Sequence, residues 1–346
     1  MQREKYIDLA KGIGILMVIF CHVIEVCEIT SLQFIFRFCY SFHMPLFFFI
    51  TGYCSGFKKN TNEKTEYLKN LKAIGASLII PYFVWSIVYL FIGGNILSSE
   101  RLIATFTTRG IAPIWFLATL AVCRIFFLTI KTLTYKLKSK TSDIILLISA
   151  LICLAFGFIM NSAKITYNLS SDTLGTTLYY LYVAAGRFFI SAPVLVGGYF
   201  FCKGKVLQKL RKIPCLLLGL LLIVGVYFAV DFFNLSTNIH LFKTNNLPAL
   251  MLTSFAGAVG VMMISYSLPS FKKGILGLIG ANSIYFMLLH YMPFKTISIA
   301  SDIFDFVENP WLFWICTSLG VLIITAAGTW VMKKGFFLTK KKSENK

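Results

Sequence analysis

The sequence predicts an all-α protein, a polytopic integral membrane bundle of about ten transmembrane helices. Hydrophobic residues make up 57% of the 346 residues and charged residues only 14%, and the mean hydropathy is +0.76. Soluble globular domains are less apolar and more highly charged. The apolar residues also occur in long runs, each near the ~20 residues that a helix needs to cross a bilayer.

The apolar runs define ten expected spans. In chain order they cover residues 7–27, 34–57, 71–93, 111–130, 143–161, 177–201, 213–231, 248–268, 275–297 and 310–332. The connections are too short for a soluble domain, so we expect residues 1–346 to form a single membrane domain. The first run has the charged start of a signal peptide, but no small-residue cleavage site follows it, and we expect it to be retained.

The basic residues predict the orientation of the spans. Most of the 33 Lys and Arg residues fall in alternate connections, and connections rich in these residues stay in the cytoplasm. The expected inner segments are 1–6, 58–72, 131–140, 203–212, 272–273 and the tail from Lys333. The expected outer loops hold only Arg101, Arg109, Lys164, Lys243 and, at a border, Lys295. Both termini are therefore expected in the cytoplasm, and the net charge of +19 reflects topology rather than nucleic-acid binding.

The first span contains titratable side chains, which are costly in a membrane and are therefore functional candidates. Lys11 and His22 are eleven residues apart, about three helical turns, so both project from one face. Asp8 precedes Lys11 by three residues and can pair with it. Glu25 follows His22 by three residues and could orient or charge its ring. The alternative for Lys11 is that it only snorkels to the inner headgroups.

Two further histidines are predicted at the same depth as His22. His22, His43 and His290 each lie about fifteen residues from the inner end of a span, or ~22 Å into a ~30 Å hydrocarbon layer. They would line one cavity in the outer half of the membrane if helices one, two and nine are neighbours. An interhelical hydrogen bond is an equal alternative for His290. The remaining histidine, His240, is assigned to an outer loop.

Arg187 lies in the middle of the sixth span and has no acidic neighbour in the sequence. It therefore needs a partner from another helix or an anionic ligand. The nine cysteines are scattered, without CxxC pairs or a metal-ligand spacing. We expect them to be small core residues, and we expect no metal site.

Several short motifs follow one another along the chain. Lys11 and His22 are a basic residue and a histidine with ten residues between them, and the later motifs are FHMPLFFFITGY at 42–53, PIWFL at 113–117, GGY at 197–199 and GANSIY at 280–285, continuing to His290. Together these motifs resemble the acyltransferase-3 family of membrane O-acyltransferases. The hallmark of that family is the spaced basic residue and histidine, and here lysine stands where many members have arginine. The segment 42–53 is most similar to the branch related to fucose 4-O-acetylases. The resemblance covers the whole chain in order.

This resemblance implies transfer of an acyl group, usually acetyl, from cytoplasmic acyl-CoA to a carbohydrate hydroxyl at the outer face. It implies acetyl-CoA as co-substrate, no tightly bound cofactor, and a carbohydrate or lipid-linked glycan as acceptor. The lipid bilayer is the remaining partner, and we expect a multi-pass protein of the bacterial plasma (inner) membrane. Some members carry a fused extracytoplasmic domain that completes the transfer. Here we expect direct acylation of the acceptor or transfer to a separate protein.

The residues expected at the site fall into three groups. They are catalytic His22, His43 and Glu25, coenzyme-binding Lys11, Asp8 and Arg187, and acceptor-binding Trp115, Tyr53, His290 and Asn282. We expect His22 to act as a general base or, as the alternative, an acyl-carrying nucleophile. His43 would polarise the thioester carbonyl or orient the acceptor. Trp115 and Tyr53 would stack on a sugar or serve packing.

The alternative function is a proton-coupled transporter or flippase of a polysaccharide precursor, with His22, Glu25 and Arg187 as a proton relay. Against it, the sequence has no paired half-repeats and no two Gly/Pro-broken spans in corresponding positions. A structural subunit of a polysaccharide-export complex is a third alternative, but it leaves the alignment of Lys11 and His22 unexplained.

Overall fold

The computed structural model describes residues 4–57, 64–92, 98–163, 173–268, 274–293 and 309–344. The first half forms α1 (Lys5–Val26), η1 (Thr30–Leu32), α2 (Gln33–Tyr40), α3 (His43–Ser55), α4 (Lys64–Ile74), the π-helical η2 (Gly75–Ile79), α5 (Ile80–Ile92), α6 (Ser99–Phe106), η3 (Ala112–Ile114), α7 (Trp115–Leu133) and α8 (Ser139–Ala163). The second half forms α9 (Thr173–Lys203), α10 (Val206–Lys209), α11 (Lys212–Phe232), β1 (Thr237–Asn238), η4 (Ile239–Leu241), β2 (Lys243–Thr244), α12 (Leu247–Ser267), α13 (Ile275–Ala281), α14 (Ser283–Leu289) and α16 (Pro310–Glu344).

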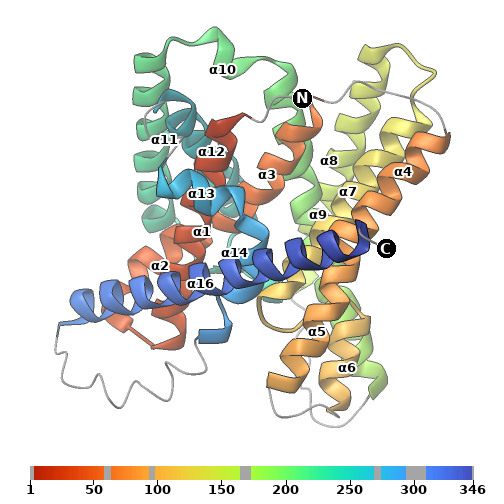
Figure 1. The fold of residues 1–346 in the computed structure, drawn as a ribbon. Coiled ribbons are helices and arrows are strands. Elements are labelled where there is room, and N and C mark those ends of the chain that lie inside the picture. The colour runs from red at the N-terminus through yellow and green to blue at the C-terminus, as the bar shows by residue number, and fades with distance from the viewer. Residues whose placement is uncertain are drawn as a thin grey trace.

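The predicted all-α fold class is confirmed, and the chain is a polytopic membrane protein. Apart from the antiparallel pair β1 and β2, the described elements are helices (Figure 1). Among the described residues, nine helical segments are long and apolar enough to cross a membrane. They are Lys5–Val26, Thr30–Ser55, Glu66–Ile92, Trp115–Leu133, Ser139–Ala163, Thr173–Lys209, Lys212–Phe232, Leu247–Ser267 and Pro310–Lys334.

The segment expected to be the ninth span, 275–297, consists of two short helices as far as it is described. α13 ends at Ala281, α14 begins at Ser283, and residues 294–297 lie outside the described part of the chain. Asn282 occupies the break and accepts a 2.8 Å hydrogen bond from the ammonium group of Lys333. Residues 58–63 of the predicted inner segment 58–72, the predicted inner segment 272–273, and the outer Lys164 and Lys295 also lie outside the described residues.

Glycines bring the central helices into close contact. A Cβ atom added at Gly52 of α3 would overlap the carbonyl oxygen of Leu195 in α9, and one at Gly198 would overlap the carbonyl oxygen of Phe49. In the same way, a Cβ atom at Gly280 of α13 would overlap the backbone of α1 at Asp8. Small residues that allow helix backbones to approach are typical of membrane helix packing. Three of the sequence motifs therefore include contacts that fix α1, α3, α9 and α13 together.

The periphery of the bundle is suited to lipid. α8 and α11 expose leucine, isoleucine and phenylalanine side chains along much of their length, whereas α1, α3 and α12 are mostly buried. Contact with lipid chains is favourable for such apolar surfaces, and contact with water is not. In Figure 1, α16 crosses in front of α1 and α14, and Trp314 donates a 2.8 Å hydrogen bond to the carbonyl oxygen of Phe20 in α1.

One end of the bundle is basic. Lys131 at the end of α7 and Lys203 at the end of α9 both form ion pairs with Asp143 near the start of α8. The N-terminus and α10 lie toward the same end of the bundle in Figure 1. The cavity described next lies toward the other end, because it is lined by the last turns of α1 and by the residues that begin α3 and α7.

Candidate active site

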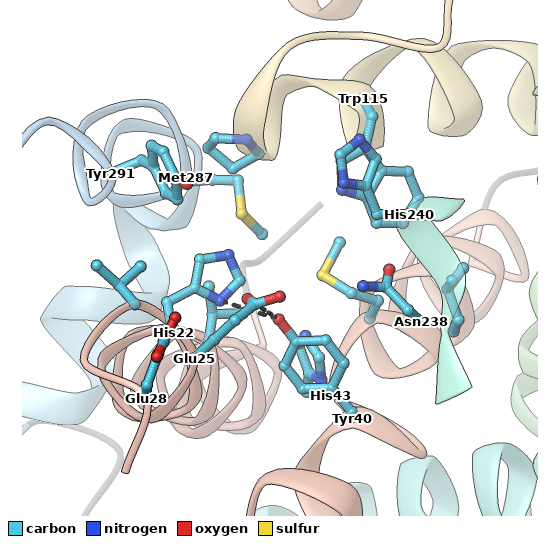
Figure 2. A pocket seen from close by; sticks show the side chains of 15 residues that line it. His22, Glu25, Glu28, Tyr40, His43, Trp115, Asn238, His240, Met287 and Tyr291 are labelled. Atoms are coloured by element: carbon cyan, nitrogen blue, oxygen red, sulfur yellow. Dashed lines mark hydrogen bonds between the residues drawn. The ribbon is translucent and has the colours of Figure 1, made fainter. Parts of the chain in front are cut away.

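The chain has four histidines; three of them line one cavity, and the fourth lies beside His22. His22 on α1, His43 at the start of α3 and His240 in η4 line a cavity of about 390 Å³ (Figure 2). The ring of His290, which follows α14, lies 5.3 Å from the ring of His22 between centroids. Within the described residues, no group of three or more His, Cys, Asp or Glu residues is arranged to hold a metal ion. The histidine rings are groups that can take up and release protons near neutral pH.

Tyr40 links His22 to Glu25. Its hydroxyl donates a 2.5 Å hydrogen bond to Oε2 of Glu25 and lies 3.5 Å from Nδ1 of His22. An ionised carboxylate can only accept hydrogen bonds, so the hydroxyl oxygen is left to accept from His22 Nδ1–H. This arrangement favours the tautomer of His22 with an unprotonated Nε2, and it provides a carboxylate to stabilise the imidazolium after proton uptake.

The hydrogen bonds of His43 and His290 fix their tautomers in the same sense. Nδ1 of His43 lies 2.8 Å from the carbonyl oxygen of Cys39, and Nδ1 of His290 lies 3.0 Å from that of Phe286. A carbonyl oxygen accepts, so each Nδ1 donates and each Nε2 of the neutral ring is an acceptor. Nε2 of His290 is buried without a hydrogen-bond partner in the described structure. His43 can therefore accept a hydrogen bond from a hydroxyl group, but as a neutral ring it cannot donate one to a carbonyl group through Nε2.

Trp115, at the start of α7, forms the opposite wall together with His240. The two rings are nearly parallel, 13° apart, with centroids separated by 5.7 Å. The guanidinium of Arg187 lies 5.1 Å from the centre of the Trp115 ring. Burial, and then the positive charges of Arg187 and Arg109, hold the pKa of His240 well below its usual range. His240 is therefore neutral at pH 7.

Arg187 is completely buried and binds backbone rather than a carboxylate. Its two terminal nitrogens donate 2.9 Å hydrogen bonds to the carbonyl oxygens of Arg109 and Thr108. The chain turns there at Gly110, whose φ of +76° is in the region that favours glycine. Arg187 lines neither this cavity nor the smaller one described next. Its predicted contact with the coenzyme stays a prediction, and in the structure it supports Trp115.

Lys11 lines a second, smaller cavity of about 130 Å³ with Thr51, Phe116 and Ser283. Along α1, Lys11 lies eleven residues before His22, or ~16 Å at 1.5 Å per residue. Met287 of α14 lines both cavities. The predicted face of α1 therefore runs past two cavities that adjoin at one side chain.

The other predicted residues lie outside both cavities. Tyr53 donates to or accepts from Tyr6 in the first turn of α1, at 2.8 Å, and Tyr6 is sixteen residues, or ~24 Å along the helix, from His22. Asp8 is buried where α1 meets α13, and Asn282 binds Lys333 at the break after α13. The functional roles predicted for these residues stay predictions, and the structure shows them in helix packing.

Comparison with protein families identifies the chain. A family model described as an acyltransferase domain, Acyl_transf_3, matches residues 4–330. The chain belongs to this acyltransferase family. Comparisons with curated proteins and with solved structures gave no match. The cavity lined by His22, His43 and His240 is thus the candidate active site of a membrane acyltransferase. The resemblance of the chain to the fucose 4-O-acetylase branch stays a prediction.

Five polar residues that line this cavity were not predicted from the sequence. Tyr40, Glu28, Asn238 and Tyr291 line the cavity and belong to no motif, and His240 was assigned only to a loop. For Tyr40 there was a signal, because a tyrosine three residues before His43 in a span expected beside the first could reach His22. For His240 and Asn238 there was none, because only the tertiary structure brings that loop to α1.

Proposed function

We propose that this acyltransferase moves an acetyl group from cytoplasmic acetyl-CoA to a hydroxyl of a cell-surface or exported carbohydrate, in the bacterial plasma membrane. Both termini then lie in the cytoplasm, with the basic end of the bundle inside and the histidine cavity toward the outer face. The basic loops support this orientation through the positive-inside rule. We also propose that, within its family, the chain belongs to the branch related to fucose 4-O-acetylases.

The observation on which the proposal depends is the pair of adjoining cavities along α1. Lys11 lines the one nearer the basic end, His22 lines the other, and Met287 lines both. A thioester that enters from the inner side and extends along this face brings its carbonyl carbon to His22. An acceptor from the outer side meets it in the larger cavity. Lys11 supplies a cation beside the coenzyme arm, where an anionic or carbonyl group is favoured.

His22 is the general base of the proposed reaction. Its Nε2 takes the proton of the acceptor hydroxyl while that oxygen bonds to the thioester carbonyl carbon. The carbon–sulfur bond then breaks, and the coenzyme A thiolate leaves and receives the proton from His22. Tyr40 and Glu25 hold the ring in the required tautomer and stabilise the imidazolium between the two steps. His43 accepts a hydrogen bond from the acceptor and orients it.

The test is transfer of the acetyl group of acetyl-CoA, to an added glycan acceptor or to water, by the purified protein in detergent without any ion gradient. We expect free coenzyme A to appear with His22 intact and to be lost in His22→Ala. A protein that consumes no thioester in detergent, yet moves a glycan precursor when reconstituted with a proton gradient, would be a transporter, and the proposal would be wrong.

A further inference from the structure

A short hairpin closes the cavity on the side away from α1. It runs from β1 through η4 to β2, residues 237–244, and the two strands pair Thr237 with Thr244. At its turn, Phe242 has a φ of +50°, a strained conformation for a residue with a side chain. The Phe242 ring packs against Gly186, where a Cβ atom would overlap it. The hairpin is thus held firmly against α9.

Two polar groups of this hairpin have hydrogen-bonding capacity left for a ligand. Asn238 accepts a hydrogen bond from the backbone N–H of Leu241 through Oδ1, at 3.2 Å, so its NH₂ group can donate elsewhere. In Figure 2 the Asn238 side chain points into the cavity. Nε2 of His240 is buried and has no hydrogen-bond partner among the described residues. Such an atom is costly unless something binds it.

The position of His240 is fixed by the side chains packed behind its ring. Its ring stacks on Trp115, and Arg187 supports Trp115 and is itself held by two backbone carbonyls. His240 lines the cavity, and a histidine used only for packing does not require an unpartnered nitrogen. Since the ring is neutral, it offers one hydrogen-bond donor and one acceptor, as a sugar hydroxyl does.

The charge of the cavity restricts its ligand further. Glu25 and Glu28 line it, and the described lining residues include no lysine or arginine. An acidic sugar would therefore face two carboxylates without a cation to pair with, which is unfavourable. At about 390 Å³ the cavity is near the lower end of the range for small-molecule sites. This size suits one sugar unit better than a long oligosaccharide.

We propose that Asn238, Ile239 and His240, the residues of the hairpin that line the cavity, form the acceptor subsite. We propose further that the subsite takes an uncharged sugar unit and rejects acidic sugars, and that His240 and Asn238 bind a hydroxyl beside the one that is acylated. This inference rests on the proposed function and adds the class of acceptor and the residues that select it. His240 selects acceptors that carry a hydroxyl beside the one that is acylated. Glu28, at the rim, repels anionic acceptors.

The first experiment compares matched acceptors with the purified full chain and labelled acetyl-CoA. The panel contains the methyl glycosides of glucose, galactose, mannose and fucose, together with the corresponding uronic acids of the three hexoses. We expect acylation of at least one neutral glycoside, with kcat/KM about tenfold or more above that of its acid. Glu28→Gln should raise kcat/KM for the acid severalfold and change the value for the neutral glycoside less.

The second experiment tests His240 through the acceptor KM and kcat. His240→Phe keeps a ring against Trp115 but removes both nitrogens, and we expect the acceptor KM to rise about tenfold or more with a smaller fall in kcat. His240→Gln restores a polar group and should recover part of the loss. Lys243→Gln, a change at an exposed position of the same hairpin, is the matched control and should leave the acceptor KM unchanged. Monodisperse elution of each variant checks that it is folded.

Equal use of the neutral and acidic sugars, or an unchanged KM in both His240 variants, would overturn the inference. So would acylation of no neutral sugar in the panel by protein that still consumes acetyl-CoA in a His22-dependent manner, and the proposed function would then stand. If the protein consumes no thioester at all, the proposed function itself is wrong and the inference fails with it.

Discussion

Replacing Tyr40 by phenylalanine removes one oxygen atom and thereby tests the link between His22 and Glu25. The hydroxyl of Tyr40 donates to Glu25 at 2.5 Å and lies 3.5 Å from His22. The ring stacks on Phe36 with centroids 3.9 Å apart, and Phe at position 40 keeps that contact. The change therefore removes the hydrogen bonds and leaves the packing in place. His22 loses the partner that fixes its tautomer, and Glu25 loses its neutral donor.

The expected loss follows from the two hydrogen bonds. A hydrogen bond to a charged group is worth ~1.5–3 kcal/mol, and the lower end applies here because Glu25 is open to the cavity and the contact to His22 is long. About 1.5 kcal/mol corresponds to roughly a tenfold fall in kcat. We expect the KM for acetyl-CoA to change less, because the proposed coenzyme site lies nearer Lys11.

The assay is release of free coenzyme A from acetyl-CoA by equal amounts of purified protein. Tyr89→Phe is the matched control, because it also removes a buried tyrosine hydroxyl, one that donates to the carbonyl oxygen of Leu288 at 2.8 Å outside the cavity. Full kcat in Tyr40→Phe would refute the role of Tyr40 in linking His22 to Glu25. An equal fall in Tyr89→Phe would also refute it, since the loss would then reflect general packing.

Three further predictions test the donor site, the helix packing and the orientation. Lys11→Arg should retain most of the acetyl-CoA turnover, whereas Lys11→Met should lose it at equal abundance; full activity in Lys11→Met would mean that the side chain only snorkels. Gly52→Ala should lower the yield of folded protein, because overpacking costs ~1–3 kcal/mol, while Gly225→Ala, where nothing lies within 4 Å, should not; equal yields would show that α3 and α9 can separate. In a cysteine-free background, a cysteine at Ser139 should be protected from an impermeant thiol reagent in intact cells and one at Ser236 should label, and the reverse pattern would invert the topology.

The fold class was predictable because lipid imposes simple requirements on the sequence. Each spanning helix must be apolar over about 20 residues, and that pattern is visible without knowing which helices are neighbours. The break at Asn282 was not predictable from hydropathy, because residues on both sides are equally apolar. The contacts of Gly52, Gly198 and Gly280 were also hidden, since a glycine at a helix crossing and one facing lipid look alike in the sequence.

The candidate site was predictable only where one helix determines the geometry. Lys11, His22 and Glu25 lie on α1, and helical periodicity alone relates their directions. The neighbours of His22 depend on tertiary structure, so His240 could not be selected from spacing, and Tyr40 could be selected only by assuming that its span lies beside the first. Polarity in a span is also ambiguous: Arg187 and His22 are equally unusual in the sequence, yet Arg187 binds backbone carbonyls and His22 lines the cavity.

The most direct test of the central claim is the activity of His22→Gln. Glutamine keeps the size and hydrogen bonding of the side chain but cannot take up a proton at neutral pH. Removal of a general base costs ~10²- to 10⁴-fold, so we expect no detectable acetylation of surface glycans, measured by mass spectrometry of cells that express the variant at wild-type abundance. Glycan acetylation at the wild-type level in His22→Gln would contradict the account, because His22 would then serve packing and not the transfer of the proton.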